Sequence, residues 1–178
     1  MLSHVIIGKP DFESQVCWID TNNHLSGQIA AEHLCSCGFK RIAFVGGEPN
    51  DEISMQRLKG FNAVMEEKGL PIPPDFIKYG DSTKASGFLL TNELLDGGNC
   101  PQAIICENNN IALGVVNSIN EHAMDEGAIK NGEASFMAYT FFGTICSAAV
   151  YELINKDKKE VADVIDNLTN YILKGIEA

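Results

Sequence analysis

The sequence lacks a long apolar run. No window reaches the roughly 18 apolar residues that a transmembrane helix needs, and residues 1–12 lack the apolar core and small-residue cleavage site of a signal peptide. We therefore predict a cytoplasmic protein with no membrane partner.

Basic residues are also scarce. The chain has 13 Lys and Arg against 24 Asp and Glu, a net charge of -11. Such a chain is poorly suited to cover phosphate backbones or anionic lipid. Any contact with nucleic acid is therefore expected to come from other residues.

Motifs for phosphate binding and catalysis are missing. The GxGxxG and GKS patterns are absent, and the loop after Gly46-Gly47 is acidic. None of the four histidines has an obvious Ser or Cys partner motif, and His33, on the same predicted helix face as Leu34, is expected to be a core or capping residue. We predict no catalytic residue, no cofactor and no enzyme.

The cysteines do not form a recognisable framework. No CxxC pair and no zinc-finger spacing is present, and two cysteines lie in apolar strand-like runs where the thiol behaves as a small hydrophobe. We expect free thiols and no metal site for all six: Cys17, Cys35, Cys37, Cys100, Cys106 and Cys146.

The informative stretch is 41–61. Residues 42–45 form a continuous apolar run closed by two glycines, which is typical of a central strand buried on both faces. A helix predicted from about 53 to 68 follows a polar loop. Sites in open parallel sheets form at the carboxyl ends of strands. We therefore expect a binding site there that includes Arg57 together with the polar residues of the loop and first helical turn: Glu48, Asn50, Asp51 and Ser54.

The same alternation runs along most of the chain. Strands are predicted at 5–7, 16–19, 42–45, 76–79, 103–106 and 136–139. Helices are predicted from Asn23 to before Gly38, at 53–68, between 85 and 95 after a cap at 80–82, and at 111–126. With 178 residues, 45% of them apolar, this predicts one compact α/β domain, a doubly wound parallel sheet.

The tail breaks the alternation. Residues 143–155 and 160–174 both have helical spacing, and the second segment carries one apolar stripe: Val161, Val164, Ile165, Leu168 and Ile172. The stripe either packs on the sheet or lies against a second subunit.

Several short motifs across residues 16–140 resemble the lactose/galactose-repressor (LacI/GalR) family of transcription regulators. They occur in the family's order and at about its spacing: 30–34 (AAEHL), 38–47 (GFKRIAFVGG), 57–61 (RLKGF), 69–71 (GLP) and 112–114 (ALG). The combination is specific, although any one motif alone is weak.

The resemblance implies a type I periplasmic-binding-protein-like domain that binds a sugar or related metabolite and changes operator affinity. On this basis residues 1–20 are the remnant of a first lobe, 21–142 the C-terminal α/β lobe and 143–178 a helical tail. A homodimer is expected, and DNA binding is expected only through an N-terminal helix-turn-helix headpiece that is missing from this sequence.

The resemblance also implies ligand contacts. Arg57 matches the family arginine that bonds ligand hydroxyls, and Asn108 matches the asparagine that follows a buried strand. Asn109 and Thr140 stand where the family has aspartates, and we keep Thr140 as a candidate contact. Two alternatives stay open: Arg57 is an exposed charge paired with a nearby carboxylate, or 108–110 only caps a helix.

Three functional classes remain at this point. The first is the effector-binding and dimerisation domain of a regulator, with ligand-linked control of DNA binding. The second is a transport-type periplasmic sugar-binding protein, which needs an export signal. The third is a flavodoxin-like or Rossmann enzyme, which needs a phosphate loop or a titratable constellation at the strand ends.

Overall fold

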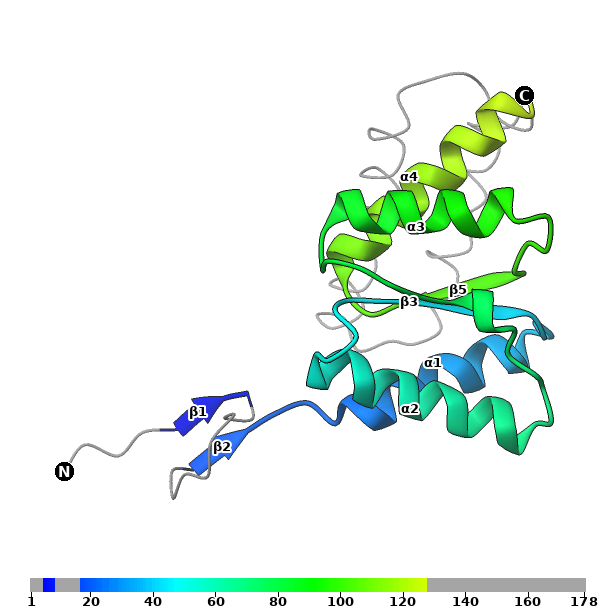
Figure 1. The fold of residues 1–178 in the computed structure, drawn as a ribbon. Coiled ribbons are helices and arrows are strands. Elements are labelled where there is room, and N and C mark those ends of the chain that lie inside the picture. The colour runs from blue at the N-terminus through cyan, green and yellow to red at the C-terminus, as the bar shows by residue number, and fades with distance from the viewer. Residues whose placement is uncertain (1–4, 9–16, 128–178) are drawn as a thin grey trace, which may run out of the picture.

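The computed structural model describes residues 5–8 and 17–127 (Figure 1). The strands are β1 (Val5–Ile7), β2 (Cys17–Ile19), β3 (Ile42–Gly46), β4 (Ile77–Tyr79) and β5 (Ala103–Cys106), and the helices are α1 (Asn23–Ser36), α2 (Glu52–Glu67), α3 (Lys84–Asp96) and α4 (Asn109–Asp125). A short 3-10 helix, η1 (Pro74–Phe76), precedes β4.

The main sheet has the order β4-β3-β5, and both pairings are parallel. The central strand β3 is buried along its whole length, as its uninterrupted apolar sequence predicts. Helices α1 and α2 cover one face of the sheet and α3 and α4 cover the other (Figure 1). This doubly wound arrangement confirms the predicted fold class.

Each face of the sheet has its own apolar core. Phe44 of β3 stacks on Phe61 of α2 with ring centroids 6.1 Å apart. On the other face, Val45 packs in a cluster with Ile111 and Val115 of α4. Alternate residues of β3 therefore serve opposite cores, which fixes the register of the strand between the helix layers.

Glycines bring the helices of each pair into backbone contact. An ideal Cβ on Gly27 of α1 would lie 2.0 Å from the carbonyl oxygen of Arg57, and one on Gly60 of α2 would lie 2.0 Å from that of His24. Gly87 and Gly114 play the same part between α3 and α4. Any side chain at these positions would push the helices apart.

A second, two-stranded parallel sheet pairs β1 with β2. Its apolar side chains are largely exposed, with Ile7 at 90% and Ile19 at 63%. The segment after β2 leads directly into α1, so this small sheet lies next to the start of that helix (Figure 1).

Two local predictions are wrong. The cap of α3 is Thr83, whose hydroxyl accepts from the Ser86 amide at 3.2 Å, and not the segment 80–82. For His33 the core alternative is wrong, because the residue is exposed and α1 buries the face that carries Gly27 and Ala31. The capping alternative is consistent with its position in the last turn of α1. The predicted strand 136–139 and the helices of the tail lie outside the described residues.

Candidate functional site

The chain changes direction within the sheet between β3 and β5. It leaves β3 through α2 on one face and leaves β5 through α4 on the other, so the loops after these strands diverge. Ligands of open α/β sheets bind in the crevice at such a switch point, outside the carboxyl ends of the strands. Arg57 and Glu107 meet at this point.

Arg57 is held by two neutral oxygens. Its Nε donates to the side-chain oxygen of Asn23 at 3.0 Å, and its Nη1 donates to the backbone carbonyl of Glu107. Within the described part of the chain no carboxylate forms an ion pair with Arg57. The predicted alternative, a pairing with Asp51 or Glu52, is therefore not what the structure shows.

Glu107 follows β5 directly and is only 6% exposed. Its carboxylate accepts the backbone N–H of Gly47, in the turn after β3. A Cβ at Gly47 would lie 2.8 Å from Glu107 Oε2 and 2.5 Å from Ser82 Oγ, so a larger residue there would require both of these side chains to shift. The ends of β3 and β5 are thus joined by a buried carboxylate.

Glu107 was not among the site residues predicted from the sequence. The signal was a carboxylate placed directly after a buried strand. Its burial depends on the Gly47 turn, which lies far from it along the chain.

The other predicted site residues lie in different surroundings. Asn108 is the N-cap of α4, and its side-chain oxygen accepts the Ile111 amide at 3.0 Å. Asn50 is exposed in the loop after β3. Ser54 is completely buried, and its hydroxyl has no hydrogen-bond partner among the described residues. Thr140 lies outside the described residues.

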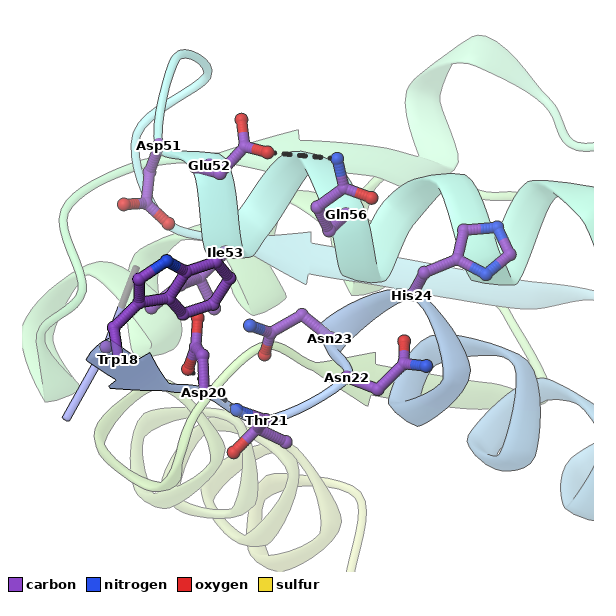
Figure 2. A pocket seen from close by; sticks show the side chains of 11 residues that line it. Trp18, Asp20, Thr21, Asn22, Asn23, His24, Asp51, Glu52, Ile53 and Gln56 are labelled. Carbon is purple, nitrogen blue, oxygen red and sulfur yellow. Dashed lines mark hydrogen bonds between the residues drawn. The ribbon is translucent and has the colours of Figure 1, made fainter. Parts of the chain in front are cut away.

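A cavity of about 830 Å³ opens between the small sheet and the first turns of α1 and α2 (Figure 2). Its lining comprises Gly8, Trp18, residues 20–24 and residues 51–53 and 56. This volume falls within the range of small-molecule sites. Arg57 and Asn108 are not among the lining residues.

Asn23 connects Arg57 with this cavity. Asn23 is 8% exposed and is one of the residues that line the cavity. Its side-chain oxygen accepts a hydrogen bond from Arg57. Guanidinium groups only donate hydrogen bonds, so the amide oxygen must face Arg57 and the NH2 group must point away from it. Figure 2 shows the Asn23 amide directed into the space beside Trp18 and Asp20.

A second cavity, of about 490 Å³, follows β5 and α4. Its lining is apolar apart from Gln102, whose side-chain oxygen already accepts the backbone amides of Lys40 and Arg41. This cavity offers little for polar recognition.

The described ranges, 5–8 and 17–127, contain neither a metal site nor a membrane-spanning helix. No group of three His, Cys, Asp or Glu side chains is placed to hold a metal ion, and no helix is long and apolar enough to cross a membrane. Five of the six cysteines are free thiols there, and Cys146 lies outside these ranges. Burial raises the pKa of Cys106 to about 12.

Comparison with known proteins points to one family. The model of periplasmic binding proteins and the sugar binding domain of the LacI family matches residues 11–145. The HTH-type transcriptional repressor PurR of Haemophilus influenzae (strain PittEE) is 33% identical over 106 residues, 60% of this chain and 32% of the relative. PurR of Actinobacillus pleuropneumoniae serotype 5b (strain L20) is 34% identical over 117 residues, 66% of this chain and 34% of that protein.

A solved structure agrees with these matches. The putative transcriptional regulator LacI from Bacillus cereus subsp. cytotoxis NVH 391-98 superposes with a TM-score of 0.62 at 29% identity, covering 66% of this chain and 42% of that one. The chain spans about a third of the length of the PurR proteins that it matches.

Proposed function

Since this chain belongs to the family of periplasmic binding proteins and sugar-binding domains of LacI-type regulators, we propose that it forms part of a transcriptional regulator whose affinity for DNA depends on a small effector. The family comprises binding proteins and not enzymes, in line with the sequence prediction. The relatives named as repressors favour a regulator over a transport protein.

The proposed effector site rests on the surroundings of Arg57. The Arg57 guanidinium is oriented by Asn23 and by the Glu107 carbonyl, yet no carboxylate in the described chain neutralises it. It lies at the switch point of the sheet and is only partly buried. An oriented and uncompensated guanidinium is a strong donor for ligand hydroxyl or carboxylate oxygens.

Asn108 contributes to the same edge of the sheet. Its side-chain oxygen is used in capping α4, and its Nδ2 is 3.4 Å from Glu107 Oε1. We place the effector, a sugar or related metabolite, against Arg57 and Asn108, with Asn50, Ser54 and Thr140 as further candidates. Ser54 is completely buried, so it can reach a ligand only if the residues around it move.

The remaining parts of the proposal concern the whole protein. They are a cytoplasmic location, a homodimer, and operator binding through a headpiece, and sedimentation equilibrium and mobility shifts of the full-length protein test the last two. Ligand-linked control requires that the effector bind one state of the protein better than another.

The experiment begins with a thermal-shift screen of sugars, nucleosides and nucleotides. A ligand found in this way is titrated calorimetrically into the wild type, Arg57→Ala and Lys59→Ala. Lys59 is exposed on the same helix, so its variant removes the same charge without touching the site.

We expect Arg57→Ala to lose about 1.5 to 3 kcal/mol of binding, or roughly tenfold to a hundredfold in affinity, and Lys59→Ala to bind as the wild type does. Equal affinities for the wild type and Arg57→Ala would move the effector away from this arginine.

A further inference from the structure

The cavity beside Trp18 has its own chemistry. Trp18 is 48% exposed, and its indole lies in Figure 2 between the carboxylates of Asp51 and Asp20. The described residues that line the cavity include three carboxylates, from Asp20, Asp51 and Glu52, and no lysine or arginine.

Two of these carboxylates are held in place by the backbone. Asp20 Oδ1 accepts the Thr21 amide at 2.7 Å, and Asp51 Oδ2 accepts the Ser54 amide at 2.8 Å. In each group the second oxygen has no partner among the described residues. The negative charge is therefore both oriented and available.

A buried polar group supplies an independent sign of a ligand. Asn23 is more than nine-tenths buried as a residue, and its amide oxygen accepts from Arg57. Its Nδ2 makes no hydrogen bond to a described residue and is not one of the buried atoms without a partner, so this nitrogen is open to the cavity. The Nδ2 group is therefore available to donate to a ligand or to water. The NH2 group points into the cavity (Figure 2).

From these features we infer that the cavity binds a small organic cation, an amine or a quaternary ammonium, stacked on the Trp18 indole. The face of an indole attracts cations, most strongly where water is excluded. Asp20 and Asp51 supply the charge, and Asn23 donates to an acceptor atom of the same ligand. This deepens the proposed function, because the effector would carry its positive end here and its acceptor atoms toward Arg57.

The test uses choline and its neutral isostere 3,3-dimethylbutan-1-ol, which replaces the quaternary nitrogen by carbon. Trp18 is the only tryptophan in the sequence, so the change in its fluorescence during titration reports directly on this cavity. Inorganic phosphate serves as the anionic probe.

The variants are Asp20→Asn and Asp51→Asn. Asparagine keeps an oxygen for the backbone amide, and it caps helices about as well as aspartate, so both changes remove charge while the local structure is retained. Asp75→Asn is the matched control, because Asp75 is exposed in η1 and does not line the cavity.

We expect choline to change the Trp18 fluorescence of the wild type and of Asp75→Asn alike. The neutral isostere should bind at least tenfold more weakly, and each of the other two variants should lose about fivefold in choline affinity.

Equal binding of choline and its isostere would overturn the inference, as would a response to phosphate with none to choline, or unchanged affinity in both variants. These results leave the effector role of Arg57 untouched, because that role is judged by a different ligand screen and by Arg57→Ala. Suppose that a neutral sugar binds through Arg57 and that its affinity is unchanged in Asp20→Asn. This result would support the proposed function and refute the inference that the cavity binds a cation.

Discussion

The close contact between α1 and α2 predicts that replacing Gly27 by alanine lowers the free energy of unfolding. In Gly27→Ala the new Cβ would lie 2.0 Å from the Arg57 carbonyl oxygen, 2.8 Å from its carbon and 3.0 Å from its Cα. All three atoms are backbone, so no side-chain rotation relieves the clash. The helices must separate by about 1 Å or more, and a packed interior resists such a shift.

Two effects oppose each other in this variant. Alanine favours a helix over glycine by about 1 kcal/mol, whereas overpacking of a close contact costs about 1 to 3 kcal/mol or more. Because the contact here is backbone against backbone, we expect the cost to dominate. The net loss should be about 1 to 2 kcal/mol in the free energy of unfolding.

Urea unfolding measures this loss. With a slope of about 1 to 3 kcal/mol per molar urea for small proteins, the midpoint should fall by roughly 0.5 to 1 M with an unchanged slope. A midpoint that stays the same or rises would show that helix propensity decides, and the proposed backbone contact would be refuted.

Gly87→Ala is the matched control for function. Its Cβ would lie 2.3 Å from the Ile111 carbonyl oxygen, so it should destabilise the α3 and α4 pair in the same way. Only Gly27→Ala shifts α1, which carries Asn23, against Arg57. The two variants should therefore resemble each other in stability, and only Gly27→Ala should disturb the hydrogen bond from Arg57 to Asn23.

Two further predictions concern single side chains. Since burial raises the pKa of Cys106 to about 12, this thiol should stay unmodified by iodoacetamide at pH 8 while exposed Cys37 reacts, as peptide mass spectrometry can show; rapid native alkylation of Cys106 would contradict its burial. The pKa of His122 is raised by its hydrogen bond to the Ser118 carbonyl and, more weakly, by Asp96. The protonated form is therefore stabilised in the fold, and this stability is present at low pH and lost as pH rises through the raised pKa. His122→Gln should be less stable than the wild type in urea at pH 5.5 and equal to it at pH 8.5, and a difference that persists at pH 8.5 would exclude protonation as its cause.

The order of strands and helices could be predicted because each signal is local. The run 42–45 predicts a buried strand by its apolar content alone, and β3 extends it by only one residue. The strand at 103–106 has the same bounds in the structure. The first residue of α3 could not be predicted in the same way, since both Thr83 and its neighbours can supply a capping oxygen.

The helix faces could not be predicted in the same way. The sequence pattern placed His33 and Leu34 on one face of α1, whereas His33 is exposed and the buried side carries Gly27 and Ala31. The contact with Gly60 selects that side. A glycine within a helix is unfavourable by helix propensity. The structure explains it, because the backbone of the neighbouring helix leaves no room for a Cβ at this position.

The site shows the same difference between local and distant signals. Arg57 and Asn108 were named as candidates because each matches a motif of the family that the sequence resembles. Glu107 and Asn23 were not named as site residues, since their roles depend on Gly47 and Arg57 far along the chain.

Asn23 contacts both Arg57 and the Trp18 cavity, so a change at Arg57 also affects the cavity. Arg57 accepts no hydrogen bond, so it fixes which end of the Asn23 amide faces the cavity. Without Arg57 the amide is free to turn and present its oxygen to the cavity, which converts a donor into an acceptor. The affinity lost in Arg57→Ala therefore contains the reorientation of Asn23 as well as the lost contacts of the guanidinium. The two contributions separate only in a cycle that includes Asn23→Ala and the double variant, because residues in direct contact are not additive.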